Sequence, residues 1–370
     1  MLVGGMFDVD INQAHQKTVT KDFPFRFDTK YQYNKKVYTN NGRTATTYVF
    51  EHGMKLDKGA RVLVPEYNCI SVFNALEAVG AEFTVYHVKQ GLIIDTKDLE
   101  KKITPDCKVI YLIHYFGVPQ PQAVVDEIRR IAKEHNLYIV EDLTQTVLSK
   151  DEGRIGFGDY VVMSTRKWYP ITDGGIAAAR DDVKLEMTEL PDGYDEAVYR
   201  QMLISLERKY FETEQGRSVK EYLQLEKEAN KARYLDFTPK NMTQMSQNIF
   251  FHADHQHSVI RRRENYTYLY ENLQNISGLT VWGEPLDPDE KYVPFGFMVL
   301  VEQRDEFYDF LADNKVIGEI QWILPDQYYK PGEYAEYLTK HSLMLQCDQR
   351  YGIKEMEYVV QVVKEYFDKK

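Results

Sequence analysis

The chain has 370 residues, 43% of them apolar and 28% charged, which is typical of a folded protein with a substantial core. The net charge of −11 argues against a partner such as nucleic acid, whose phosphates require a basic surface. The three cysteines, Cys69, Cys107 and Cys347, match neither a disulfide framework nor a zinc site, and such usage is typical of a reducing cytoplasm.

The first residues, MLVGGMFDVDINQ, lack the basic start and apolar core of a secretory signal. No apolar run approaches the roughly 20 residues that a membrane-crossing helix needs. We therefore expect a soluble, cytoplasmic protein without a membrane partner.

Between about residues 37 and 180, short apolar runs alternate with amphipathic stretches. These runs are too short for helices and rich in Val, Ile and Tyr, so they predict strands. The predicted strands are 61–67, 82–88, 108–117, 137–142, 158–164 and 175–180. Residues 123–136 place Val124, Val125, Ile128 and Ile131 on one helical face. Strands that alternate with helices predict a large, mostly parallel sheet covered on both faces, an α/β fold.

After residue 180 the pattern changes. Residues 219–235, VKEYLQLEKEANKARYL, predict a charged connecting helix with Glu and Lys on neighbouring turns. The remaining elements are expected to be helices near 255–275, 305–313 and 355–368 and strands at 293–301 and 316–324. This order predicts a large unit, residues 1–235, and a smaller C-terminal α+β unit, residues 236–370.

Polar side chains follow the predicted strands at the edge where ligands of parallel sheets bind. They are Tyr67, Asn68 and Cys69 after the first, His114 after the third, Glu141, Asp142 and Gln145 after the fourth, and Ser164 and Lys167 after the fifth. Any one of them has an ordinary structural explanation, but the group indicates a site.

Asp142 and Lys167 carry the sharpest chemical prediction. Asp142 ends an apolar strand, where it is either a helix N-cap or a carboxylate that keeps a pyridinium nitrogen protonated. Lys167 stands between Arg166 and Trp168 in STRKWYPITDGG, an unusual setting for a solvated lysine. A crowded site with a nearby cation lowers the pKa of a lysine and favours imine chemistry.

The segment 40–53, NNGRTATTYVFEHG, places a glycine before a helical pattern. Gly42, Arg43 and Thr44 are expected to hold a phosphate at the start of this helix, with Ser164 as a further hydroxyl donor. The ordinary alternative is a turn and helix cap. Neither a G-x-G-x-x-G after a strand nor a P-loop motif occurs, which weakens dinucleotide and nucleotide-phosphate interpretations.

Two further polar groups are ambiguous. His114 either lines a cofactor pocket or is a hydrogen-bonded histidine at a strand end. Arg350, in LQCDQRYG, either grips a substrate carboxylate or phosphate or forms a salt bridge. The histidines of HADHQH (252–257) favour a solvated helix face, and we expect no metal site.

In this order, the segments resemble the DegT-type sugar aminotransferases, a branch of the fold-type I enzymes that use pyridoxal 5′-phosphate. The resemblance covers nearly the whole chain. It is carried by NNGRTA, by VLVPEYNCISVFNALEAVGAEFTVYHV, by Glu141-Asp142-Leu143-Thr144-Gln145, and by Lys167 seven positions before Gly174-Gly175.

The resemblance implies that Lys167 forms the imine link to pyridoxal phosphate and that Asp142 pairs with its ring nitrogen. It places Gln145 near the ring hydroxyl and Gly42, Arg43 and Ser164 at the phosphate. Cys69 stands where relatives often have an aromatic residue that stacks on the ring, so Tyr67 or a neighbour is expected to stack instead.

Two other departures indicate a divergent subgroup. The Ser-x-x-Lys spacing of Ser164 and Lys167 is shorter than in many members. The Asn-x-Arg motif that reaches a partner's phosphate in relatives is missing, and residues 239–250 are the candidate replacement.

The implied reaction moves an amino group from an amino acid, expected to be glutamate, to a keto-sugar, expected to be nucleotide-linked, for a polysaccharide or glycoside. A homodimer is implied as well. The alternatives are another pyridoxal phosphate reaction on a non-sugar substrate, such as a lyase or transaminase, and a binding protein that has lost catalysis. Lys167 argues against the dehydratase branch, whose members replace this lysine.

Overall fold

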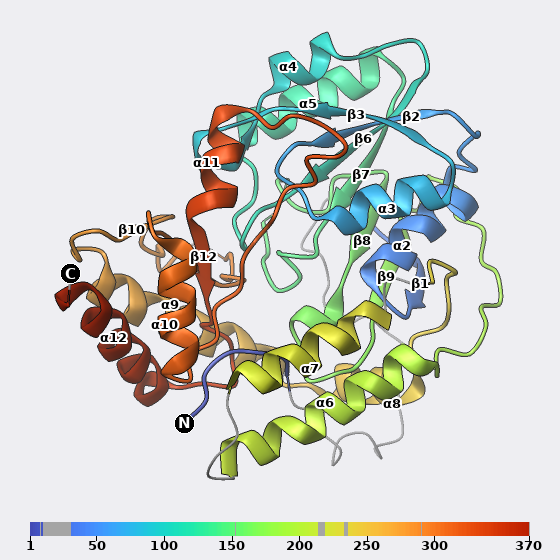
Figure 1. Cartoon of the computed structure of the whole chain (residues 1–370). Helices are drawn as coiled ribbons and strands as arrows, with labels where there is room; N and C mark the ends of the chain where they lie inside the picture. The colour runs from blue at the N-terminus through green and yellow to red at the C-terminus, as the bar shows by residue number, and fades with distance from the viewer. Residues whose placement is uncertain are drawn as a thin grey trace.

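A seven-stranded sheet lies at the centre of the large part of the molecule (Figure 1), in the order β1-β9-β8-β7-β6-β2-β3. The computed structural model describes residues 1–7, 9, 31–151, 153–213, 219–232, 236–289 and 291–369. The sheet consists of β1 (Lys35–Thr39), β2 (Arg61–Pro65), β3 (Glu82–Tyr86), β6 (Cys107–Ile113), β7 (Tyr138–Asp142), β8 (Tyr160–Met163) and β9 (Gly175–Ala179). Strands β3, β2, β6, β7 and β8 are parallel, whereas β9 and β1 are antiparallel to their neighbours. The expected mostly parallel α/β sheet is therefore confirmed.

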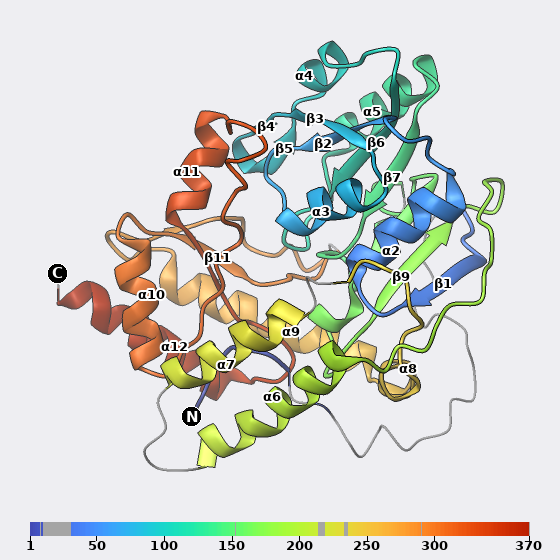
Figure 2. The ribbon, with the colours of Figure 1, turned by 45° about the vertical axis from the view of Figure 1, so that its right-hand side comes forward.

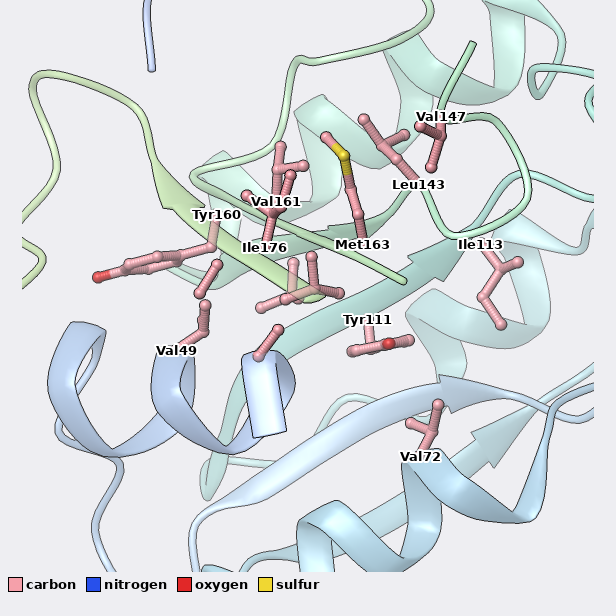
Figure 3. Packing of buried hydrophobic residues seen from close by; sticks show 14 of the residues in the cluster. Val49, Val72, Tyr111, Ile113, Leu143, Val147, Tyr160, Val161, Met163 and Ile176 are labelled. Atoms are coloured by element: carbon pink, nitrogen blue, oxygen red, sulfur yellow. The ribbon is translucent and has the colours of Figure 1, made fainter. Parts of the chain in front are cut away.

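Helices cover both faces of this sheet because successive residues of each strand face opposite sides. In β6, Val109, Tyr111 and Ile113 join the core on one face. Ile110 and Leu112 join the core on the other face. The first face packs against α2 (Gly42–Tyr48) and α3 (Ile70–Ala78), and the second packs against α5 (Gln122–Glu134). Figure 3 shows the first of these cores from close by.

Several short elements complete the large part. They are a π-helical turn (Val49–Gly53), the hairpin of β4 (Val88–Lys89) and β5 (Ile93–Ile94), the 3₁₀ turns at Gln90–Leu92 and Thr165–Lys167, and α4 (Thr96–Lys101). The turn at Thr165–Lys167, called η3 below, connects β8 to the segment that leads into β9.

Two long helices, α6 (Glu196–Thr213) and α7 (Val219–Ala232), lie side by side below the sheet (Figures 1 and 2). They pack on the N-terminal Leu2 and on Ile317 of the C-terminal part. The short helix α8 (Gln244–His252) follows, and its Ile249 and Phe250 belong to the core of the large sheet.

The C-terminal part contains a second, three-stranded sheet in the order β10-β11-β12. Its elements are α9 (His255–Leu273), β10 (Thr280–Val281), β11 (Phe297–Leu300), α10 (Arg304–Asp313), α11 (Glu333–His341), β12 (Ser342–Leu345) and α12 (Ile353–Asp368). This sheet and its helices enclose a core of their own. No helix in the described residues is long and apolar enough to cross a membrane.

One predicted strand, 316–324, is wrong. This segment makes only two isolated bridges, Val3 with Val316 and Glu319 with Met344. Val316 and Ile317 are buried at its start, whereas Ile323 near its end is 74% exposed, so its apolar residues do not mark one face of a sheet. The segment then leaves the small sheet and brings Trp322 to the large one. The strands that complete the small sheet, β10 and β12, and helix α11 were not predicted.

The division into units 1–235 and 236–370 stays a proposal. Contacts cross it in both directions, since α8 packs on the large sheet and Val3 pairs with Val316.

Candidate active site

A cavity of about 780 Å³, partly open to solvent, lies at the carboxyl edge of the large sheet. Its walls come from the start of α2, the segment after β2, β6, the end of β7, η3, and Trp322 of the C-terminal part. Tyr111 and Ile113 of β6 and Val72 of α3 form its floor on the face shown in Figure 3. Seven of the predicted site residues line it, namely Gly42, Arg43, Cys69, Asp142, Gln145, Ser164 and Lys167. The sequence pattern therefore located this edge correctly.

Asp142 is the carboxylate of the cavity. It pairs with Ile113 in the sheet and therefore shares a face with Tyr111. Its Oδ2 accepts a hydrogen bond from Tyr111 Oη at 2.7 Å, and its Oδ1 accepts one from Thr144 N at 2.8 Å. These two donors fix the orientation of the carboxylate and leave lone pairs on both oxygens.

The neighbouring Glu141 points to the opposite face and has a structural role. Its side chain is fully buried, and its oxygens accept hydrogen bonds from the backbone N–H groups of Gly156, Phe157 and Gly158 at 2.8–2.9 Å. The Glu141 carboxylate thus holds the loop before β8. Glu141 and Asp142 are adjacent in the strand, so their side chains point to opposite faces and have different roles.

His114 does not line the cavity. Its Nε2 contacts Glu141 Oε1 at 2.9 Å, and its Nδ1 accepts a hydrogen bond from Gln120 N at 2.9 Å. The ring is fully buried away from the cavity lining. This geometry favours the alternative of a hydrogen-bonded histidine at a strand end.

The start of α2 borders the cavity. A Cβ atom on Gly42 would lie 2.9 Å from Ser164 Cβ, so only a glycine lets α2 approach β8 this closely. Thr44, by contrast, is buried and does not line the cavity. Thr44 N donates to the side chain of the N-cap Asn41, and Thr44 Oγ1 accepts from Asn41 N. Thr44 thus belongs to a capping box rather than to a phosphate site.

Lys167 ends η3 and lines two cavities, the one described above and a wider one on its other side. Its Nζ lies 6.0 Å from the centre of the Phe295 ring. Arg166 and Arg43 also line both cavities. Lys167 is thus the primary amine of the cavity that contains Asp142, and the second cavity opens beside it.

Tyr67 does not line the cavity and so does not provide the stacking ring. It is fully buried, its hydroxyl donates to the backbone carbonyl of Gln321, and its ring packs at 5.5 Å from that of Trp322. Trp322 itself lines both cavities and also stacks on Phe116 at 6.4 Å. Cys69 lines the cavity as well, so the aromatic wall comes from Trp322 instead of the segment after β2.

The Gln145 amide is partly used by the protein. Its Oε1 accepts a hydrogen bond from Phe116 N at 2.9 Å, and its Nε2 lies 3.4 Å from Gln321 Oε1. The second contact is long and therefore weak. The Nε2 donor is the part of Gln145 that can serve a ligand in the cavity.

Arg350 lines the wider cavity, but its guanidinium is occupied by the protein. It forms an ion pair with Asp348 at 2.7 Å and donates to the backbone carbonyls of Gly5 and Met6. These contacts fasten the N-terminal segment to the turn before α12. This geometry favours the salt-bridge alternative over the substrate role.

Asn68 has an unsatisfied side chain in the cavity wall. It is fully buried, and neither Nδ2 nor Oδ1 has a hydrogen-bond partner in the described part of the chain. A buried amide without partners costs about 1–3 kcal/mol. The natural partner of such a group is a polar ligand in the cavity. The sequence placed Asn68 at the edge but assigned it no role.

Other lining residues were not predicted either. They are Asn41, Thr46, Ser71, Val72, Tyr111, Ile113, Thr144, Arg166 and Trp322. Tyr111 could have been found, because strand alternation places it on the same face as Asp142. Trp322 could not, since no local pattern connects it to this sheet.

Residues 12–205, just over half of the chain, match the model of the DegT/DnrJ/EryC1/StrS aminotransferase family. The chain belongs to this family. Its members are aminotransferases that use pyridoxal phosphate, and the expected enzyme class and cofactor are thereby confirmed.

Solved structures of aminotransferases share the fold. DesV from S. venezuelae has 22% identity and a TM-score of 0.62, over 90% of this chain and 84% of that one. PseC from Helicobacter pylori, an aminotransferase involved in the biosynthesis of pseudoaminic acid, has 14% identity and a TM-score of 0.66, over 91% and 88%. DesI, crystallised in the presence of its TDP-sugar product, has 17% identity and a TM-score of 0.63, over 89% and 80%.

The donor set of the cavity fits pyridoxal phosphate. The carboxylate of Asp142 suits a protonated ring nitrogen, and the amine of Lys167 suits an aldehyde carbon. The unpaired amide of Asn68 offers both a donor and an acceptor to a polar ring substituent. The close contact of Gly42 and Ser164 leaves backbone and hydroxyl groups for a phosphate.

Replacing Asn68 by leucine should raise the stability of the protein and weaken its binding of pyridoxal phosphate. We expect the cofactor-free protein to gain about 1 kcal/mol in free energy of unfolding, because an unsatisfied amide is removed. The Kd for pyridoxal phosphate should rise about tenfold, because the amide no longer meets the ligand. Urea unfolding and fluorescence titration measure the two effects.

Asn265→Leu is the matched control for this substitution. Asn265 is also fully buried, but its Nδ2 donates to the carbonyls of Cys347, Asp348 and Tyr351. Its replacement should lower stability and leave cofactor affinity unchanged. A stability loss in Asn68→Leu without a change in affinity would contradict a ligand role for Asn68.

Glu141→Gln and Asp142→Asn should have opposite effects, although the residues are adjacent. Glu141→Gln should lower the free energy of unfolding by about 3 kcal/mol, because the amide nitrogen of Gln cannot accept the backbone hydrogen bonds. Its affinity for pyridoxal phosphate should stay within about twofold. Asp142→Asn should spare stability and impair cofactor binding. Reduced affinity in a fully stable Glu141→Gln variant would refute this division of roles.

Proposed function

We propose that this enzyme transfers the amino group of an amino acid, glutamate, to the keto group of a nucleotide-linked sugar that is used in a polysaccharide or glycoside. The observation that carries the proposal is the wide, basic cavity that opens beside Lys167 and Trp322. The family gives the reaction class. PseC is involved in the biosynthesis of pseudoaminic acid, and DesI forms a TDP-sugar product.

Pyridoxal phosphate supplies, when bound, an electrophilic carbon for the amino group and a ring that withdraws electrons from the reacting carbon. The carboxylate of Asp142 holds positive charge on a ring nitrogen, which strengthens that withdrawal. Tyr111 Oη and Thr144 N keep the carboxylate in place without using all its lone pairs. Asp142 therefore acts as a fixed charge.

We assign Lys167 two tasks. As the primary amine of the cavity, its Nζ would hold the cofactor, and it would also carry the proton to and from the reacting carbon. It lies between the cofactor cavity and the wider cavity, so it can reach a substrate from either side. Cys69 and Trp322 border the same junction.

The wider cavity, about 2270 Å³ including open solvent, favours an anionic substrate. Seven of its lining residues are lysine or arginine and two are glutamate, in a chain whose net charge is −11. Arg350 and Lys220 are neutralised by Asp348 and Asp313. Lys227 and Lys231, one turn apart on α7, have no ion-pair partner in the described residues. Such a surface suits the phosphates of a nucleotide-linked sugar.

A homodimer and a cytoplasmic location are further parts of this proposal. Size-exclusion chromatography with light scattering tests the dimer.

Lys167→Ala should abolish the first half of the reaction. Mixing the enzyme, pyridoxal phosphate and glutamate without an acceptor should yield about one equivalent of 2-oxoglutarate per chain. The variant should form it at least about 10³-fold more slowly, because the nucleophile and proton carrier are gone. Lys133→Ala, on the exposed side of α5, is the control and should behave as the wild type. Unchanged product formation in Lys167→Ala would refute the assignment.

Removing both lysines of α7, Lys227→Ala with Lys231→Ala, should raise KM for a nucleotide-linked keto-sugar about tenfold, because two charge contacts to phosphate are lost. The kcat and the KM for glutamate should stay within about twofold. Lys364→Ala, an exposed lysine of α12, is the control. An unchanged KM in the double variant would place the phosphates elsewhere. A nucleotide-free keto-sugar used equally well by the wild type would refute the nucleotide part.

A further inference from the structure

We propose that Tyr111 is a positioning residue for the reaction, whose hydroxyl holds the Asp142 carboxylate in the orientation in which it faces the cofactor cavity. The inference rests on the proposed role of Asp142. It concerns the part of the site that neither a motif nor the family assigns.

The geometry connects the two side chains directly. Tyr111 Oη donates to Asp142 Oδ2 at 2.7 Å, a short, charge-assisted hydrogen bond. In the sheet, Tyr111 pairs with Val140, two positions before Asp142 on the same face. The Tyr111 ring therefore reaches forward along the sheet to meet the carboxylate. Figure 3 shows this ring between the sheet and Val72 of α3.

The environment keeps the Tyr111 hydroxyl a donor. Burial, and next the charge of Asp142, raise the pKa of Tyr111 well above its ordinary value, so the phenol retains its proton. The side chain is fully buried and cannot exchange this bond for water. The backbone carbonyl of Tyr111 is itself fixed, because it accepts a hydrogen bond from Tyr86 Oη at 2.8 Å.

Asp142 then has no freedom to turn away from the cavity. One oxygen is held by Tyr111 Oη and the other by Thr144 N. Without the phenol, Oδ2 of Asp142 would lose the donor from Tyr111 and would face the cavity. The Asp142 side chain could then rotate about χ1 and χ2. The ring packing alone does not explain the residue, since phenylalanine would fill the same space.

The cavity around Tyr111 also reaches α2. Thr46 of α2 lines the same cavity as Tyr111 and Asp142, and Thr46 Oγ1 donates to Gly42 O at 3.0 Å.

The test compares Tyr111→Phe with Tyr160→Phe, each alone and the first also in an Asp142→Asn background. Tyr160 is also buried, its hydroxyl donates to the backbone carbonyl of Lys184 at 2.9 Å, and it does not line the cavity, so it is a matched control. Three quantities are measured on folded protein: the Kd for pyridoxal phosphate, the ¹⁵N chemical shift of the labelled ring nitrogen, and the rate of 2-oxoglutarate formation from glutamate.

We expect Tyr111→Phe to weaken pyridoxal phosphate binding about fivefold, slow the half-reaction about tenfold and move the ring ¹⁵N resonance toward that of the unprotonated nitrogen. Tyr160→Phe should leave all three unchanged. In the Asp142→Asn background, Tyr111→Phe should change binding and rate by less than about twofold, because its target is gone.

Four results would overturn the inference. Effects of Tyr111→Phe that persist in full without the Asp142 carboxylate would show a packing role, and so would a lowered Tm with an unmoved ¹⁵N resonance. If Asp142→Asn alone alters neither the resonance nor the rate, the proposed role of Asp142 fails and this inference with it. If only Tyr111→Phe is silent, the role of Asp142 stands and the positioning role is refuted.

Discussion

Two adjacent carboxylates end β7, and the site depends on the strand alternation that sends them to opposite faces of the sheet. Glu141 goes to the face of α5, where backbone N–H groups and His114 surround it. Asp142 goes to the face of α2 and α3, where the cavity lies. A shift of one position along the strand thus gives Glu141 a structural role and places Asp142 in the cavity. Every other part of the site is arranged around the second face.

The elements that place the site could be predicted because each has a local cause. Short apolar runs rich in Val and Ile gave the parallel strands, and polar residues after them marked the edge where ligands bind. The elements of the small sheet were harder to predict from the sequence. β10 has only two residues, too few for a periodic pattern. The segment 316–324 has the apolar residues of a strand, but in the described part of the chain it makes isolated bridges only.

Whether a predicted polar residue serves the cavity depends on a different property of the chain. A sequence shows that a polar residue stands at the right edge, but not whether the protein itself satisfies it. Thr44, His114 and Arg350 all find their partners within the chain, in a capping box, a buried pair and an ion pair. Asn68 finds none, and its neighbours in the sequence give no sign of that difference. Trp322 reaches the cavity only through the packing of the C-terminal part.

This contrast gives a physical criterion for the function of the cavity. A folded chain satisfies nearly all its buried polar groups, so a fully buried amide left open carries a cost that selection for stability alone would remove. Asn68 opens into the same space as Asp142, whose carboxylate is held by two donors yet keeps lone pairs free. A cavity that combines a rigidly held charge with an unsatisfied amide is preorganised for a polar ligand. A ligand that pairs with Asn68 would recover the stability given up there and would couple the folding of this edge to ligand binding.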